Sequence, residues 1–296
     1  MKHMSIPRLA MLPGGLAGAL AGAIALATPA AALTVTQTTN GGTLLNALVA
    51  NPTDFASIGA TYSVGAASQV GTYTGFTAPP VSIGNGVVLS SGQAVQTTAA
   101  FHSASDTPSS SLGGGSTAQI NAYAPGKVTN WSSSHDAAQL SVNFTLSAAS
   151  AIAFDFAFGS IEFPNFVSNF TDAFYAFLDG QQISFDANGN PVQVGASFSS
   201  TLTTADANTA FSNPHGLIGV LTTTSGPLVA GAHQLNLVVA DTNDGVLDSA
   251  VFLANLRLAS NDGGPVTNPS GVPEPASMAL LGAALLGLGL SRRRRG

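Results

Sequence analysis

Residues 140–158 read LSVNFTLSAASAIAFDFAF and contain two runs in which every second residue is apolar. The first run ends at Leu146, and the second begins at Ile152 and continues through three phenylalanines to Phe158. A period of two places alternate side chains on opposite faces of a β-strand. We therefore predict two core strands here. We assign to the core the eight phenylalanines that lie between Phe154 and Phe177; an aromatic platform for a ligand is the alternative.

Shorter alternating runs extend this pattern along the chain. From residue 62 onward, stretches rich in Val, Ile, Thr, Tyr and Phe are separated by Gly, Pro, Asn and Ser. Two further core strands are expected at 235–239 and 252–258, with the apolar residues 252, 254, 256 and 258 on one face. Many short strands at this spacing predict a mainly β fold, an antiparallel, jelly-roll-like β-sandwich.

Helical spacing is confined to one short segment near the start of the domain. Apolar residues at 44, 45, 48 and 49 predict a single helix, capped by Thr43 and stopped by Asn51-Pro52. The segment 101–126 is rich in Ser, Gly, Thr and Ala and is predicted to be a surface loop.

Both ends of the chain have the composition of transport signals. Residues 1–32 combine Lys2 and Arg8 with an apolar stretch and a small-residue end, the pattern of a secretory signal peptide. The apolar run at 276–290 is short for a spanning helix, which needs about 20 residues. It is followed by four arginines, which by the positive-inside rule leave the domain outside the cytoplasm: Arg292, Arg293, Arg294 and Arg295.

The segment between these ends is strongly acidic. Between residues 33 and 270 only Lys127 and Arg257 are basic, against thirteen acidic residues, so the formal charge is −11 compared with −6 for the whole chain. Nucleic acid is therefore not an expected partner. The chain has no cysteine, so its exported domain must be held together by its core.

One acidic cluster has the composition of a cation site. Four oxygen-bearing side chains surround Gly245: Asp241, Asn243, Asp244 and Asp248. Hard oxygen ligands at this density suit calcium, and Glu162 and Asp172 would complete the site if their strand ends are adjacent. The spacing is not that of an EF-hand, because the glycine comes one position early and the terminal glutamate is missing. Ordinary turn formation by Asp, Asn and Gly is the alternative.

Catalytic interpretations have less support in the sequence. Glu162 with Asp172 or Asp241 would supply the two carboxylates of a glycosidase, but thirteen acidic residues produce such pairs by chance. No G-x-S-x-G motif precedes a helix, and the histidines lack metal-binding spacing. We therefore expect that the protein is not an enzyme.

Four motifs resemble the choice-of-anchor L domain of bacterial surface proteins. They are NGVVLSSG at 85–92, FAFGSIEFPNFV at 156–167, FTDAF at 170–174 and ADTNDGVLDSAVF at 240–252. The resemblance implies a β-rich extracellular module found in adhesin-like and matrix proteins, without established catalytic activity. Ile161 and Phe163 stand where the family's Ser-Glu-Glu-Tyr stretch has an acidic residue and a tyrosine.

The tail resembles the PEP-CTERM sorting signal, because Pro273, Glu274 and Pro275 precede the apolar run and the arginines. That resemblance implies an exosortase-type membrane protease as partner and cleavage near the Pro-Glu-Pro sequence in a Gram-negative bacterium. A retained single-pass anchor is the alternative.

These patterns divide the chain into four parts. We expect a signal peptide at 1–32, a choice-of-anchor L-like β-sandwich at 33–260, a linker at 261–271 and a sorting signal with a hydrophobic helix at 272–296. The expected function is a structural or adhesive role at the cell surface or in an extracellular biofilm matrix, after sorting at the inner membrane. Exopolysaccharide or other surface proteins are the expected partners. The alternatives are a calcium-dependent carbohydrate-binding module and an extracellular hydrolase.

Overall fold

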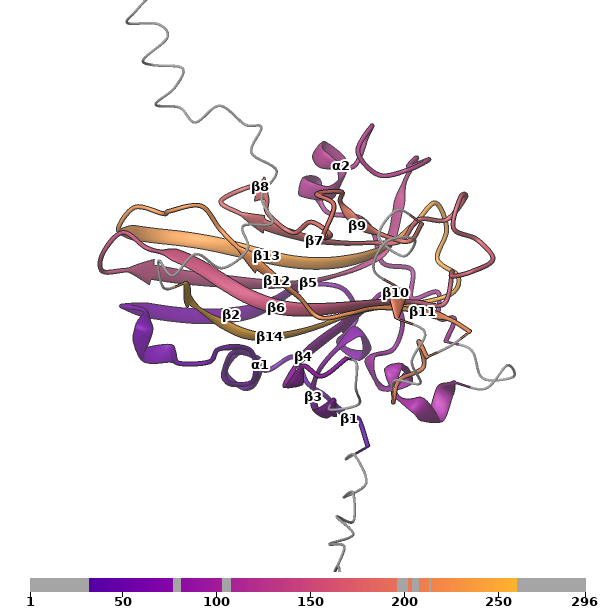
Figure 1. The fold of residues 1–296 in the computed structure, drawn as a ribbon, viewed down its shortest axis with the longest axis horizontal. Coiled ribbons are helices and arrows are strands. Elements are labelled where there is room, and N and C mark those ends of the chain that lie inside the picture. Colours follow the sequence, from indigo (N-terminus) through magenta and orange to yellow (C-terminus); the bar gives the residue numbers. More distant parts are fainter. Residues whose placement is uncertain are drawn as a thin grey trace, which may run out of the picture.

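Two antiparallel sheets lie face to face and enclose the core (Figure 1). The computed structural model describes residues 32–76, 81–102, 108–195, 202–203, 208–212 and 214–259. The predicted mainly β fold with two antiparallel sheets is confirmed. The signal peptide and the apolar run at 276–290 lie outside the described residues, within which no helix is long and apolar enough to cross a membrane.

The first sheet has eight strands. β12 (Leu221–Thr224) pairs with β6 beside β11. The remaining strands lie in the order β1 (Thr34–Gln37), β3 (Val70–Phe76), β4 (Gly84–Ser90), β14 (Ser249–Ala259), β6 (Ala151–Ser160), β11 (Gly216–Ile218) and β10 (Leu202–Thr203).

The second sheet has six strands and is built around one long central strand. That strand, β13, pairs with β5 on one side and with β7 on the other. β9 (Val192–Gln193) also pairs with β7. The strands lie in the order β2 (Ser57–Val64), β5 (Ser134–Leu146), β13 (Gly231–Thr242), β7 (Ala173–Leu178) and β8 (Gln181–Gln182).

The main core lies between the sheets and contains the residues that the alternating runs predicted. Ile152, Phe154, Phe156 and Phe158 of β6 all face it and are completely buried. β5 and β13 face them with Leu, Val and Phe side chains. Each such side chain contributes about 1.5–3 kcal/mol when fully buried. The assignment to the core is confirmed for Phe154, Phe156, Phe158, Phe174 and Phe177. It is wrong for Phe166, which is 39% exposed because it lies in the loop after β6, and Phe163 and Phe170 are only partly buried.

Strand β14 differs from its prediction because it contains a bulge. Its pairing with β6 shifts register between Ala254 and Arg257, and Asn255 has a positive φ of 57°. Before the bulge, Phe252 and Ala254 pack on the outer face of the eight-stranded sheet; after it, Leu256 packs in the main core. The prediction that residues 252–258 present one continuous apolar face is therefore wrong, because the extra residue exchanges the two faces.

Two α-helices lie against the sheets. In α1 (Gly41–Leu48), Leu44 and Leu48 are buried in the core, as the spacing predicted. The cap is Asn40 rather than the predicted Thr43, because the Asn40 side chain accepts the Thr43 amide at 2.9 Å. The short 3₁₀ helices are η1 (Pro52–Asp54), η2 (Ala67–Gln69), η3 (Ala94–Thr97) and η4 (Ala99–Phe101).

The second helix, α2 (Ala118–Tyr123), lies in the segment predicted to be only a surface loop. Its cap is Thr117, whose hydroxyl accepts the Ile120 amide at 3.2 Å. Ile120 is completely buried in a cluster with Tyr175 and Phe177, whose rings stack 5.8 Å apart on the outer face of the six-stranded sheet. This tertiary contact, rather than helical periodicity, stabilises so short a helix.

Candidate functional site

Buried acidic side chains gather at one end of the sandwich, where strands of both sheets begin or end. Asp241 lies near the end of β13, and Asp172 immediately precedes the neighbouring strand β7, since Ala240 pairs with Ala173. In the other sheet, Asp248 immediately precedes β14 and Glu162 follows β6. These four carboxylates, each no more than 1% exposed, form what we call the acidic cluster.

Asp172 is held firmly by hydrogen bonds from both sheets. The Thr242 amide donates to Oδ1 at 2.9 Å and the Ser249 hydroxyl donates to Oδ2 at 2.6 Å. Burial nevertheless raises the pKa of Asp172 to about 7, against the lowering effect of these bonds. The carboxyl therefore keeps its proton to a higher pH than a free aspartate does.

Asp241 is completely buried, and neither of its carboxylate oxygens accepts a hydrogen bond from a donor group, although the Asp172 carboxylate lies within hydrogen-bonding reach. Burial raises its pKa well above the usual range, and the nearby charges of Asp172, Asp248 and Asp136 raise it further. The Ser91 hydroxyl lies near enough to lower this pKa but without hydrogen-bonding geometry. An unpartnered buried carboxylate is unusual in a folded protein and calls for a partner of some kind.

Asp248 and Glu162 each have an oxygen without a partner. The Ser110 amide donates to Oδ1 of Asp248 at 2.8 Å, but Oδ2 of Asp248 and Oε2 of Glu162 accept no hydrogen bond. Burial raises the pKa of Asp248 to about 6. Burial, followed by the charges of Asp172 and Asp244, raises the pKa of Glu162 to about 9. Both carboxyls therefore hold protons more strongly than free side chains do.

Asp136 is a further member of this region that the sequence analysis did not identify. It lies at a bulge between β5 and β13 and has a positive φ of 46°. Its carboxylate accepts the amides of Leu112 at 3.1 Å and Gly114 at 2.6 Å, and so fixes the Gly-rich loop over this end of the sandwich. No local motif marks Asp136, because its position depends on a pairing between strands distant in sequence.

The remaining predicted residues have different surroundings. The side-chain oxygen of Asn243 accepts hydrogen bonds from Ser132, and its amide group donates to the carbonyls of Asn130 and Asn169. Asn243 thus ties separate loops together. Asp244 is partly exposed, and its carboxylate accepts the Val246 amide at 3.3 Å, as in an ordinary Asx turn.

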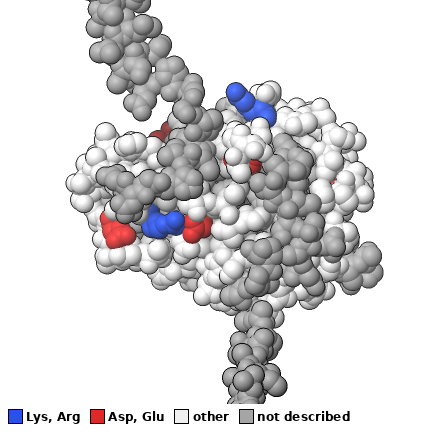
Figure 2. Space-filling model, viewed as in Figure 1, with Lys and Arg blue, Asp and Glu red and all other residues white. Residues whose placement is uncertain are grey.

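No basic side chain compensates the acidic cluster within the described part of the chain. The two ion pairs found there are His233 with Asp179 and Arg257 with Asp155. On the face shown in Figure 2 most of the described surface carries no charge. The described residues also contain no group of three or more His, Cys, Asp or Glu side chains already arranged around one metal position. The cluster as it stands can therefore take up protons.

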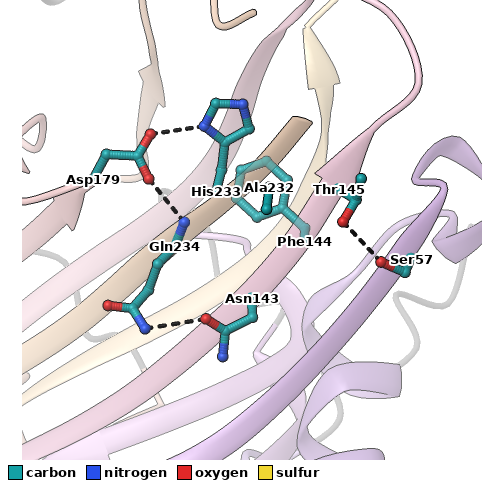
Figure 3. Close-up of a pocket in the computed structure, with 8 residues that line it drawn as sticks. All are labelled: Ser57, Asn143, Phe144, Thr145, Asp179, Ala232, His233 and Gln234. Atoms are coloured by element: carbon teal, nitrogen blue, oxygen red, sulfur yellow. Dashed lines mark hydrogen bonds and ion pairs between the residues drawn. The ribbon is translucent and has the colours of Figure 1, made fainter. Parts of the chain in front are cut away.

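A shallow depression of about 340 Å³ lies at the opposite end of the six-stranded sheet (Figure 3). Its polar groups bond mainly to one another: Asp179 accepts the Gln234 amide at 2.9 Å and pairs with His233 at 2.7 Å, and Gln234 donates to Asn143 at 3.0 Å. Because these polar groups already form hydrogen bonds with one another, the depression is a weaker candidate for a ligand site than the acidic cluster, whose oxygens are in part without a donor.

The fold and this acidic end define a cysteine-free antiparallel β-sandwich with a buried carboxylate cluster. A model of the Choice-of-anchor L domain matches residues 34–258, and the PEP-CTERM protein-sorting motif matches residues 271–295. The first match covers most of the chain, so the protein belongs to the choice-of-anchor L family. Searches of curated proteins and of solved structures found no match.

The sorting motif identifies the export route. A PEP-CTERM motif implies export, membrane-anchored sorting and processing by exosortase, a membrane enzyme. The predicted residues of the signal lie outside the described residues of the structure: Pro273, Glu274, Pro275, Arg292, Arg293, Arg294 and Arg295.

Proposed function

We propose that this protein is a non-catalytic structural or adhesive component of the cell surface or extracellular matrix. The observation that carries the proposal is the order of its parts: a choice-of-anchor L domain at 34–258 followed by an exosortase sorting motif at 271–295. Exosortase removes the tail, and the released domain associates with exopolysaccharide or other surface proteins. A sandwich held by an extensive apolar core suits this role, because it needs no disulfide outside the cell.

Mass spectrometry of the C-terminus from native cells, combined with cell fractionation, tests this proposal. We expect surface or matrix copies to end near Pro273-Glu274-Pro275 and to lack the arginines at 292–295. Alanine substitution of these three residues should leave the full-length chain in the inner membrane. Alanine at Pro265 and Pro269 is the matched control and should not change processing. Intact arginines on all surface copies would refute processing, and retention of every copy in the cell would refute the surface role.

A second candidate function, calcium-dependent carbohydrate binding, is favoured by one feature beside the acidic cluster. Phe166 is 39% exposed, and the centroid of its ring lies 6.1 Å from that of the Phe170 ring, edge to face. The Phe166 amide also donates to the Glu162 carbonyl at 2.9 Å, which fixes this aromatic pair next to the cluster. An exposed aromatic ring beside a cation is a suitable surface for stacking a sugar ring.

A glycan array probed in calcium and again in EDTA separates the two candidates. Sugar binding that requires calcium and is lost in Phe166→Ala would support the second function. Phe101→Ala, at a partly buried ring elsewhere, is the matched control. No binding to any glycan, in either buffer, would eliminate it.

A hydrolase is the third candidate, because the raised pKa of Glu162, about 9, would suit a general acid. Turnover of a polysaccharide that is lost in Glu162→Ala and in Asp241→Ala would overturn the non-catalytic proposal.

A further inference from the structure

The acidic cluster combines high negative charge with the means to hold a ligand rigidly. Its carboxylates come from the ends of both sheets, and the backbone around them is fixed by hydrogen bonds to Asp172 and Asp136. No lysine or arginine of the described residues forms an ion pair with it. Like charges crowded in this way repel one another strongly unless protons or a cation neutralise them.

A second observation distinguishes this cluster from an ordinary group of acidic residues. Asp241 is completely buried, and neither of its oxygens accepts a hydrogen bond from a donor group, although the Asp172 carboxylate lies within hydrogen-bonding reach and Asp248 lies near. Oδ2 of Asp248 and Oε2 of Glu162 are also unpartnered. Four unsatisfied carboxylate oxygens in one buried region point to a ligand that accepts electron pairs.

The Asp248 carboxylate has room in this region only because residue 92 is a glycine. A Cβ atom on Gly92 would lie 1.7 Å from Oδ2 of Asp248, so this carboxylate packs directly against the Gly92 backbone. Asp248 therefore occupies a place that any larger residue at position 92 would fill.

We propose that Asp241, Asp248 and Glu162 bind one calcium ion, with Asp172 as a further oxygen ligand. The available donors are carboxylate, hydroxyl and carbonyl oxygens, which select a hard cation. Calcium fits better than magnesium, because it accepts irregular geometry while magnesium requires a near-ideal octahedron. The carboxylates must rotate towards a common point, and Asp241 is less restrained than Asp172, because neither Asp241 oxygen accepts a hydrogen bond from a donor group.

Such an ion would fasten the two sheets at this end of the sandwich. Asp241 belongs to the six-stranded sheet and Asp172 adjoins it, whereas Glu162 and Asp248 adjoin strands of the eight-stranded sheet. Bound calcium is thus expected to stabilise the whole domain. The inference does not depend on the proposed surface role, since a cation site is compatible with any location outside the cell.

Calorimetric titration of calcium chloride into the EDTA-treated full-length chain tests the proposal, together with the melting temperature. We expect saturable binding and an increase in Tm of about 5–10 °C at about one hundred times the Kd. Magnesium chloride should give a smaller increase at the same concentration. No heat of binding and no change in Tm with calcium would overturn the proposal.

Two substitutions locate the site. Asp241→Asn should weaken calcium binding at least tenfold, because it replaces an anionic oxygen ligand with a neutral amide. Asp186→Asn is the matched control: Asp186 is equally buried, and the asparagine oxygen can still accept the amides of Asn188 and Asn190, so calcium affinity should not change.

Calcium affinity unchanged by Asp241→Asn would overturn the assignment. If that variant does not fold, the calcium affinity of Glu162→Gln is measured instead. Oε2 of Glu162 accepts no hydrogen bond, so this substitution removes none at that atom. Unchanged calcium affinity in Glu162→Gln would then count against the site.

Discussion

The stability of the calcium-free protein should fall steeply as pH rises, which is opposite to the behaviour of a domain whose carboxylates are paired with cations. Asp172, Asp248 and Glu162 all have folded-state pKa values above their unfolded values. At a pH between the unfolded-state pKa and the folded-state pKa of these carboxyls, the folded chain therefore binds more protons than the unfolded chain. By linkage, the contribution of these carboxyls to the free energy of unfolding is greatest below their unfolded-state pKa and is lost as pH rises through their folded-state pKa.

The magnitude follows from Asp172, which is completely buried. Its pKa rises from 3.8 to about 7, which corresponds to about 4 kcal/mol of stability lost between about pH 4 and pH 7. The pKa of Asp248, raised to about 6, adds a loss of about 3 kcal/mol if the two act independently. Since neighbouring carboxyls interact, we expect a total loss of at least about 4 kcal/mol, a large fraction of a typical domain's stability.

Urea unfolding followed by circular dichroism in EDTA, at about pH 4.5 and about pH 8.5, measures this loss. His215 slightly offsets this loss. Burial lowers the pKa of that histidine, so its contribution to stability increases as pH rises. Calcium at the higher pH should restore most of the stability. A free energy of unfolding in EDTA that is equal or greater at the higher pH would refute the reasoning.

Three further substitutions probe other parts of the molecule. Phe252→Ala removes a ring that contacts three aromatic neighbours and should cost about 3–5 kcal/mol in urea unfolding; a cost below about 1 kcal/mol would contradict the packing described. Gly92→Ala must displace the Asp248 carboxylate, so we expect reduced stability and a weaker calcium response, and an unchanged response would argue against this role. Partial burial lowers the pKa of His233, but its hydrogen bond to Asp179 raises that pKa overall. Asp179→Asn should therefore lower the pKa of His233 in an NMR titration. No change in this pKa would show that the pair is not formed in solution.

The alternating faces of the strands could be predicted from the sequence, but the bulges could not. Period-two patterning identified the inward phenylalanines of β6 because each faces a continuous core. Asn255 and Asp136 interrupt the pattern with positive φ angles, which Asn and Asp adopt more readily than most residues. Such residues are equally common in ordinary turns, so the sequence around them does not reveal a bulge.

The candidate site could be predicted only in part for a related reason. Asp241 and Asp248 are close in sequence, and motif resemblance together with strand ends suggested Glu162 and Asp172. Asp136 depends on the long-range pairing of β5 with β13 and was missed. The tethering role of Asn243 likewise depends on loops that lie far apart along the chain.

A crystal structure of the full-length chain grown in calcium, with anomalous diffraction data, tests the calcium assignment most directly. We expect one anomalous peak, with carboxylate oxygens of Asp241, Asp248 and Glu162 at about 2.3–2.6 Å from it. Absence of an anomalous peak among these carboxylates would contradict the assignment.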